Sequence, residues 1–373
     1  MIVRELKYCL DCGKCSGGCP VSPVSNPRRA IRDYLHSGDY EELYRKFWYC
    51  TLCELCRVRC PAGVDYPRFV RAKRAEFFSK YFGSYPASVR EMNSSVDETM
   101  NVFGMEGEDR MMWTYEVEDL VSDRIGKRAP IAYFVGCTAS SMISLEGIPS
   151  SFTRILHKLG VDYTVLGADE WCCGDPLIVC QGRDSDPRVS ELIKGNVSSL
   201  SDLGVRTLVT ACAGCYRVFK LEYPQILGHP LDFRVLHTSE FLAEMIDAGR
   251  LSIQRKADKP ITYHDPCELG RAAGVFEAPR KVLEYAAGEN FVEVDMNREQ
   301  TKCCGAGGLF STVHPKIALD IAKSKLNDFY DVEATVCVTG CPACELNLTN
   351  AVRETNSDLK IVDIVEFLSP LIE

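Results

Sequence analysis

The chain has 373 residues, of which 46% are hydrophobic and 25% are charged, a composition typical of an ordinary globular protein with two or three domains. Its 43 basic and 52 acidic residues give a formal net charge of −9. This charge argues against nucleic acid as the main partner, because phosphate binding needs a basic surface.

The first residues, Met1 to Leu6, contain no positively charged segment followed by an apolar region and a cleavage site, so we expect no export signal. No run approaches the ~18 apolar residues that a membrane helix needs. We therefore expect a cytoplasmic protein that reaches a membrane only through a partner. Twenty cysteines would stay reduced there, so they indicate iron–sulfur or other metal ligation rather than disulfides.

The N-terminal part contains the pattern C-x2-C-x2-C-x3-C-P twice, at residues 9–20 and 50–61. In such a run, three thiolates hold one [4Fe–4S] cube and the fourth binds the other cube. A pair of zinc sites is the alternative, but zinc does not require four cysteines within eleven residues. The runs therefore predict two cubane clusters, one held by Cys9, Cys12, Cys15 and Cys60, and the other by Cys50, Cys53, Cys56 and Cys19.

Helices are predicted around these runs, from an Asn26-Pro27 start onward, at 40–49 and after Pro67, so residues 1–83 should form an α-helical ferredoxin domain. The basic residues of the last helix, Arg68, Arg71, Lys73 and Arg74, are expected on a solvated face rather than at a docking site. Residues 84–128 have weak periodicity and several methionines. They form either a connector that packs over the clusters or a partner-binding arm.

From Pro130 onward, short apolar strands alternate with helical stretches, at 131–135, 163–166, 207–210 and 233–236. A second half repeats the pattern, with 260–263 matching 130–133 and 365–368 matching 239–242. We therefore predict an α/β fold in which the helical domain precedes two halves, 129–256 and 257–373, with mostly parallel sheets and a pseudo-twofold relation.

Each half carries five cysteines, and the second set follows the first at offsets of 129 to 131 residues. The first set is Cys137, Cys172, Cys173, Cys212 and Cys215, and the second is Cys267, Cys303, Cys304, Cys341 and Cys344. Adjacent cysteines suit a single tetrahedral metal poorly, but they can reach different irons of one cluster. Five thiolates exceed the needs of a cube, so we expect an opened or otherwise atypical cluster in each half. Structural zinc and reduced structural thiols are the alternatives.

Glycines accompany both sets, and Gly174, Gly305, Gly307 and Gly308 are expected to let the backbone approach the sulfurs and donate N–H groups to them. The stretch 305–308 lacks the full nucleotide-binding fingerprint. The two remaining cysteines, Cys180 and Cys337, are expected to be small buried apolar residues.

The spacing of Cys137, 171–174 and 212–215, together with its repeat, resembles the CCG domains of heterodisulfide reductase catalytic subunits. The front part, with 47–51 before its second run, resembles the partner subunit that carries two cubanes. Together they resemble the fused form that works with a membrane cytochrome in methanogenesis. The same layout occurs in iron–sulfur subunits of glycolate and glycerol-3-phosphate dehydrogenases, which share the 264–271 motif, but two intact five-cysteine sets favour the reductase.

By this resemblance, each set holds a noncubane [4Fe–4S] cluster, and a coenzyme M–coenzyme B heterodisulfide lies between the two sets. The cubanes then carry electrons from a donor subunit, which is a cytochrome b, a flavoprotein or a hydrogenase or dehydrogenase module. His264 is a candidate proton donor. The candidate cations for the substrate's sulfonate and phosphate are Arg217, Lys220, Arg271 and Lys302.

Two other functions stay open at this point. In the first, the chain is a non-catalytic electron-transfer subunit of a flavin dehydrogenase or a quinone-linked membrane complex. In the second, it is a scaffold held together by zinc.

Overall fold

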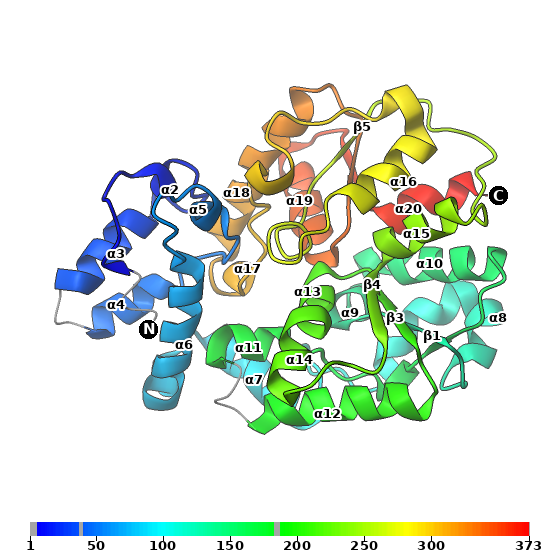
Figure 1. Ribbon diagram of the computed structural model, residues 1–373, viewed down its shortest axis with the longest axis horizontal. Helices are drawn as coiled ribbons and strands as arrows, with labels where there is room; N and C mark the ends of the chain where they lie inside the picture. Colours follow the sequence, from blue (N-terminus) through cyan, green and yellow to red (C-terminus); the bar gives the residue numbers. More distant parts are fainter. Residues whose placement is uncertain (1–5, 37–39, 183–186, 373) are drawn as a thin grey trace.

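The computed structural model describes residues 6–36, 40–182 and 187–372. A helical N-terminal domain lies beside two α/β halves, which are placed one above the other in Figure 1. Each half contains a parallel sheet, so the predicted fold class is confirmed. The expected domain boundaries near residues 83, 128 and 256 lie outside the α-helices and strands.

The N-terminal domain is built from helices that alternate with the cysteine loops. These are α2 (Lys14–Gly17), α3 (Pro27–His36), α4 (Tyr40–Phe47), α5 (Leu55–Val58) and α6 (Tyr66–Tyr81). Asn26 caps α3, since its side-chain oxygen accepts the N–H of Arg29 at 2.9 Å. Helix α6 departs from the prediction of a solvated basic face, because Arg74 is fully buried and Lys73 is 8% exposed.

The two cysteine runs have the same backbone conformation. Asp11 and Leu52 occupy equivalent positions in the two loops, and both have positive φ, at 53° and 54°. Gly13 and Glu54 also correspond, with φ of 77° and 64°. Left-handed conformations in non-glycine residues cost about 1 kcal/mol or more each, so the surrounding structure must impose them.

Residues 84–128 pack against the first α/β half. They contain α7 (Ala87–Thr99), the 3₁₀ segment Glu108–Val117 and α8 (Glu118–Val121). The carbonyl of Met100 accepts the N–H of Cys172 at 2.9 Å. The buried Trp113 packs into the core of the first half. This segment therefore reaches the first five-cysteine set directly.

The first half contains a four-stranded parallel sheet in the order β2-β1-β3-β4. Its strands are β1 (Ile131–Phe134), β2 (Tyr163–Val165), β3 (Thr207–Thr210) and β4 (Arg234–His237). Its helices are α9 (Cys137–Ser141), α10 (Gly147–Lys158), α11 (Asp175–Gln181), α12 (Pro187–Asp202), α13 (Ala213–Arg217), α14 (Tyr223–Leu227) and α15 (Thr238–Asp247). Ala132, Tyr133 and Phe134 are all fully buried, as expected for a strand covered on both faces.

The second half repeats this plan with one strand fewer. Its sheet has the order β5-β6-β7, formed by β5 (Ile261–Tyr263), β6 (Val336–Thr339) and β7 (Lys360–Asp363). A single parallel bridge between Ile261 and Phe291 stands where β2 pairs with β1 in the first half. Its helices are α16 (Glu277–Ala287), α17 (Phe310–Val313), α18 (Pro315–Tyr330), α19 (Pro342–Thr355) and α20 (Ile364–Leu368).

Helices α15 and α20 mark the pseudo-twofold relation between the halves. Each begins with a capping box, formed by His237 with Glu240 and by Asp363 with Glu366. His237 also crosses between the halves, since its Nε2 donates to the carbonyls of Ala211 at 3.2 Å and Gly340 at 3.0 Å. This one imidazole therefore ties together the loops that precede Cys212 and Cys341.

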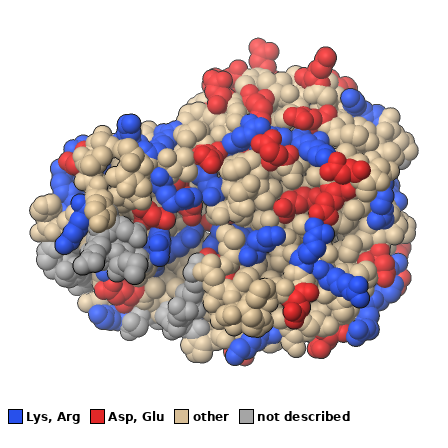
Figure 2. Space-filling view, in the orientation of Figure 1, with Lys and Arg blue, Asp and Glu red and all other residues tan. Residues whose placement is uncertain are grey.

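Figure 2 shows Lys and Arg interspersed with Asp and Glu over the face in view. Within the part of the chain that the structure describes, every helix is too short or too polar to cross a bilayer.

The buried His237 predicts a pH dependence of stability. Burial lowers the pKa of His237 to about 4, below the unfolded value near 6.5. The unfolded chain therefore binds more protons between these values, and the contribution is complete above about pH 6.5 and is lost as the pH falls toward 4. We expect this residue to account for a loss of about 1.4 kcal/mol between pH 7.5 and 5.5.

Melting temperatures of wild type and His237→Asn over this pH range test this expectation. Asparagine can cap α15 but does not titrate, so the variant should lose stability less steeply as the pH falls. Equal slopes for the two proteins would contradict it.

Candidate iron–sulfur centres

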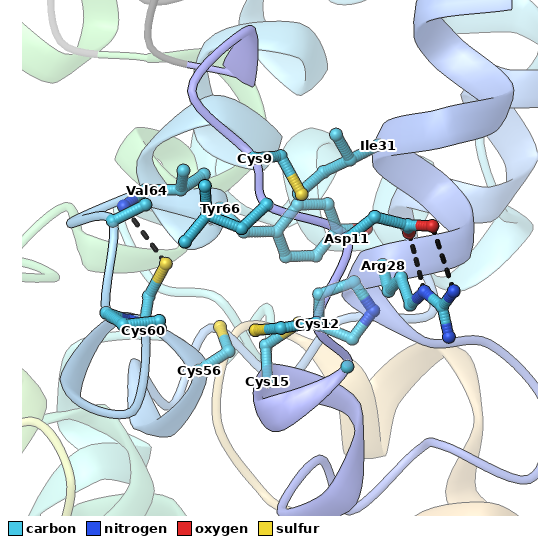
Figure 3. A pocket seen from close by; sticks show the side chains of 15 residues that line it. Cys9, Asp11, Cys12, Cys15, Arg28, Ile31, Cys56, Cys60, Val64 and Tyr66 are labelled. Carbon is cyan, nitrogen blue, oxygen red and sulfur yellow. Dashed lines mark hydrogen bonds and ion pairs between the residues drawn. The ribbon is translucent and has the colours of Figure 1, made fainter.

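The outer pocket lies in the N-terminal domain, and cysteines from both runs line it. Their sulfurs face a common space in Figure 3. The cysteines that line it are Cys9, Cys12, Cys15, Cys56 and Cys60. Cys12 is exposed, and the neighbouring Leu10 is 66% exposed. An N–H from Val64 donates to the Cys60 sulfur at 3.3 Å. The four cysteines predicted for one cubane therefore lie around one pocket that opens to the surface.

The inner pocket adjoins the outer one, and Cys56 lines both. The cysteines of this inner pocket are Cys19, Cys50, Cys53 and Cys56. Three of them are less than one-tenth exposed, and burial raises the pKa of Cys50 to about 11. The structure thus brings together the four cysteines predicted for the second cubane, at a depth that solvent barely reaches.

The first five-cysteine set is assembled at the carboxyl ends of β1 and β3. Cys137 begins α9 directly after β1, Cys212 caps α13 after β3, and Cys215 lies in α13. Cys172 and Cys173 lie in the loop before α11. Neighbouring thiols interact in the order Cys137, Cys172, Cys173, Cys215 and Cys212, and the N–H of Cys215 donates to the sulfur of Cys212 at 3.5 Å. Loops after parallel strands are where open sheets place their sites.

The second set has the same construction. Cys267 follows β5, the pair Cys303–Cys304 precedes α17, Cys341 caps α19, and Cys344 lies in α19. The sulfurs of Cys304 and Cys344 are 3.2 Å apart. Further thiol contacts join Cys267 to Cys303 and Cys341 to Cys344. All ten cysteines of the two sets thus fall into two groups that match the repeat.

The glycine after each cysteine pair has a definite role. Gly174 and Gly305 have φ of 89° and 90°, a conformation that other residues rarely adopt. This turn directs their N–H groups back to the sulfurs of Cys172 and Cys303, at 3.4 and 3.3 Å. Such N–H donors stabilise negative charge on sulfur.

Two contacts join these groups into one continuous series of thiols. Cys212 of the first set interacts with Cys341 of the second, and the carbonyls of the residues that precede them, Ala211 and Gly340, accept hydrogen bonds from the same imidazole, that of His237. Cys303 of the second set packs against Cys53 of the inner pocket, and the interaction of the two thiols lowers the pKa of Cys53 to about 5. Thiols therefore run without interruption from the inner pocket through the second set to the first.

The donor chemistry fits iron–sulfur clusters. Eighteen thiols form four groups, and soft thiolate ligands select iron–sulfur clusters, zinc or monovalent copper. Buried thiolates are costly without a metal, and burial raises the pKa of Cys56 well above its usual value. Each five-cysteine set has one thiol more than the four ligands that a single zinc ion binds, and two of its cysteines are consecutive in the sequence.

His264 lies beside the second set. Its ring is 1% exposed, and its ligand atom lies within 4.8 Å of the sulfurs of Cys304 and Cys344. Neither ring nitrogen has a hydrogen-bond partner of regular geometry among the described residues. The equivalent position in the first half is Phe134, so the two sets differ at this point.

The four candidate cations are each engaged within the chain. Arg217 pairs with Asp175, Glu222 and Glu268, and Lys302 pairs with Asp328 at 2.5 Å. The remaining two bind carbonyls: Lys220 donates to Val235 at 3.2 Å, and Arg271 donates to Cys53, Thr301 and Glu299. These partners give the four side chains structural roles.

A buried ion pair next to the first set was not predicted from the sequence motifs. Arg110 of the connector lies 2.7 Å from Glu170, and both side chains are less than 5% exposed. Glu170 also accepts the N–H groups of Val135 and Gly136, each at 2.8 Å, immediately before Cys137. The position of Glu170 next to the cysteine pair was the only signal in the sequence. Arg110 gave none.

Cys180 and Cys337 lie within α11 and β6, and both are fully buried. Their sulfurs donate to the carbonyls of Leu177 and Val338. Burial raises the pKa of Cys180 to about 12.

Comparison with known proteins follows this organisation. Residues 131–220 and 261–349 match the CCG model, a cysteine-rich domain, and residues 5–64 match a 4Fe-4S dicluster domain. The chain is 33% identical to a subunit of dihydromethanophenazine:CoB–CoM heterodisulfide reductase from Methanosarcina barkeri, over 98% of this chain and 94% of that protein. The chain belongs to the family of this heterodisulfide reductase subunit. The resemblance predicted from the cysteine spacing is thereby confirmed, and the chain is an iron–sulfur oxidoreductase.

Other relatives have different names. The chain is 29% identical to EtfAB:quinone oxidoreductase from Syntrophomonas wolfei, over 95% of this chain and 51% of that protein. It is also 29% identical to a subunit of fumarate reductase (CoM/CoB) from Methanothermobacter marburgensis, over 98% of this chain and 72% of that protein.

The buried pair predicts a strong coupling between the connector and the first half. Removing one partner alone leaves a buried charge, which costs about 3 to 5 kcal/mol. We expect Arg110→Met and Glu170→Gln each to lower the melting temperature strongly, and the double variant to recover part of the loss. Melting of all four proteins measures the coupling.

The matched control is the exposed pair Arg234–Glu244, whose side chains are 61% and 44% exposed. Its removal should cost less than about 1 kcal/mol. Additive effects of the two substitutions at Arg110 and Glu170 would show that the pair is not coupled.

Proposed function

We propose that this chain is the catalytic subunit of a heterodisulfide reductase, which cleaves a disulfide between its two five-cysteine sets. The observation that carries the proposal is that Cys212 and Cys341 are neighbours, because the residues before them, Ala211 and Gly340, both accept hydrogen bonds from the imidazole of His237, at 3.2 and 3.0 Å. It makes the two sets neighbours across the pseudo-twofold relation, which is the arrangement that a substrate with two sulfurs requires. The heterodisulfide reductase relatives, which match nearly the whole chain, support the same activity.

The proposed cofactors follow the four groups of thiols. The outer pocket would hold a [4Fe–4S] cubane on Cys9, Cys12, Cys15 and Cys60, and the inner pocket a second on Cys19, Cys50, Cys53 and Cys56. Each five-cysteine set would hold a noncubane [4Fe–4S] cluster. When bound, these clusters supply one-electron transfer and iron atoms that attract sulfur.

The proposed reaction is R–S–S–R′ + 2 e⁻ + 2 H⁺ → R–SH + R′–SH, and the substrate is the coenzyme M–coenzyme B heterodisulfide named for the relatives. The chain's own residues provide a buried place for this step, because eight of the ten thiols in the two sets are less than one-tenth exposed. Exclusion of water strengthens the electrostatic interactions of the product thiolates.

His264 is the proposed proton donor for one product thiolate. Its imidazole is buried beside Cys304 and Cys344 and makes no regular hydrogen bond to a described residue. From this position beside the Cys304 thiol, it would pass a proton to a product thiolate at the second set. The first half has Phe134 at this position, so a proton for the other thiolate needs a different source.

Electrons would enter at the outer pocket, because Cys12 is its most exposed cysteine and the adjacent Tyr8 and Leu10 are 67% and 66% exposed. The proposed donor is a separate subunit, such as a cytochrome b, a flavoprotein or a hydrogenase or dehydrogenase module. Any membrane association would arise through that subunit, with the chain itself in the cytoplasm.

A second candidate function is electron relay to a partner that performs the chemistry. The similarity to EtfAB:quinone oxidoreductase favours it, because that relative also matches along 95% of this chain. In this case the five-cysteine sets would be reduced but would not consume a disulfide.

Turnover with reduced methyl viologen as the one-electron donor distinguishes the two functions. We expect the purified, iron-loaded protein to oxidise two viologens for each coenzyme M–coenzyme B heterodisulfide consumed and to release two thiols. Cys341→Ser and Cys212→Ser should lose most of this turnover. Cys337→Ala, a buried cysteine outside both sets, should retain it.

Full iron content and rapid reduction by viologen without consumption of the heterodisulfide would overturn the reductase proposal. The same result would support electron relay.

A further inference from the structure

Two buried arginines join the inner cysteine run to the second half from opposite sides. Arg74 extends from α6 of the N-terminal domain, and Arg271 lies four residues after Cys267 in the second half. We propose that Arg74 and Arg271 are positioning residues that hold the inner pocket against the second five-cysteine set, so that electrons pass to this set before the first. This inference rests on the proposed electron path, but it concerns transfer within the chain rather than the final electron acceptor.

Arg74 binds three backbone carbonyls. Its Nη2 donates to Cys50 at 2.9 Å and to Phe47 at 3.0 Å, and its Nη1 donates to Gly308 of the second half at 2.9 Å. The guanidinium is fully buried and lies 4.4 Å from the ring centroid of Trp48. One side chain therefore connects the start of the inner cysteine loop with the loop that follows Cys304.

Arg271 makes the reciprocal connection. Its Nε donates to the carbonyl of Cys53 at 2.5 Å, and its Nη1 donates to those of Thr301 at 2.7 Å and Glu299 at 3.1 Å. The side chain thus connects the inner cysteine loop with the backbone segment that immediately precedes Cys303. Burial opposes its charge, but Cys53 and the neighbouring thiols outweigh burial and raise the pKa of Arg271.

The chemistry of the guanidinium suits this role. Its planar group presents several N–H donors in fixed directions, so one side chain can bind carbonyls from two segments at once. Lysine has a single nitrogen at the end of a flexible chain and cannot hold the same geometry. Both arginines also place a positive charge near thiolates that would ligate the clusters, Cys50 for Arg74 and Cys53 for Arg271.

Glycines permit the close approach that these arginines hold. A Cβ atom on Gly308 would lie 2.9 Å from the carbonyl oxygen of Thr51, and one on Gly307 would lie 3.0 Å from the same oxygen. Gly307 and Gly308 therefore pack directly on the inner cysteine loop. In the first half, Pro176 and Leu177 stand at the positions that correspond to these two glycines.

The result of this packing is that Cys53 and Cys303 lie in one buried cluster. The first set instead meets the second through Cys212 and Cys341. Electron transfer slows steeply with distance. The arginines that fix the contact between Cys53 and Cys303 therefore determine how fast electrons arrive at the second set.

Rapid-freeze paramagnetic resonance of the iron-loaded protein, mixed with reduced methyl viologen and no disulfide, tests the proposal. Signals are assigned by their loss in Cys12→Ser and Cys341→Ser. In the wild type, the second set should be reduced before the first. In Arg271→Met, the N-terminal centres should be reduced at the normal rate, while reduction of the second set should be delayed at least tenfold.

Three further variants separate position from charge. Arg271→Lys and Arg74→Lys keep the positive charge but lose the planar guanidinium that donates to two segments. The delay should therefore persist, while the reduction potential of the second set should stay close to that of the wild type. Gly307→Ala keeps both arginines and displaces the loops by a few tenths of an ångström, so it should cause a smaller delay. It also preserves the test if an arginine variant fails to fold.

Arg250→Met is the control for loss of an arginine that binds a carbonyl away from this junction, since Arg250 donates to Leu159 within the first half. It should change neither rate. Normal reduction of the second set in Arg271→Met, Arg271→Lys and Gly307→Ala would overturn the proposal, as would reduction of the first set before the second in the wild type. Because no disulfide is present, either outcome is independent of whether the chain reduces a heterodisulfide.

Discussion

Burial of many thiols in one place is the constraint on which the rest of this structure depends. A buried thiolate is costly unless a metal or an N–H donor stands beside it, and the two α/β halves bury most of ten thiols around their common boundary. The fold meets this requirement by placing cysteines where strands end and helices begin, as Cys137, Cys212 and Cys341 illustrate. It adds a glycine in a left-handed conformation after each cysteine pair, so that backbone N–H groups point at sulfur.

The two five-cysteine sets share this plan, but different side chains support the backbone around each set. The connector supports the first set, through Arg110 and Glu170 and through the carbonyl of Met100. The N-terminal domain supports the second set, because its Arg74 donates to Gly308 of the second half and its Cys53 carbonyl accepts from Arg271 of the second half. His264 stands beside one set and Phe134 at the matching place in the other half. The two halves therefore differ in function-related surroundings, because the second five-cysteine set is the one joined to the inner pocket by these arginines.

Much of this organisation follows from the sequence, because cysteine spacing and strand periodicity are local and repeat along the chain. The alternation of strands and helices predicted both parallel sheets, and the offset of the cysteines predicted that the halves match. The buried arginines escaped prediction because their partners are backbone carbonyls far away in sequence, such as Gly308 for Arg74. For the same reason, the sequence suggested Arg217 and Arg271 as cations that bind the substrate. In the structure, carboxylates of the chain bind Arg217 and backbone carbonyls bind Arg271. The missing fourth strand of the second sheet also had no local signal, since the single bridge at Phe291 depends on tertiary packing.

The N-terminal domain distributes its cysteines in a crossed pattern, since the outer pocket draws Cys60 from the second run and the inner pocket draws Cys19 from the first. Neither pocket is complete until both runs have folded and come together. One cysteine run by itself therefore supplies only part of the lining of either pocket. This exchange of one cysteine between the runs makes the completion of each pocket depend on the other run.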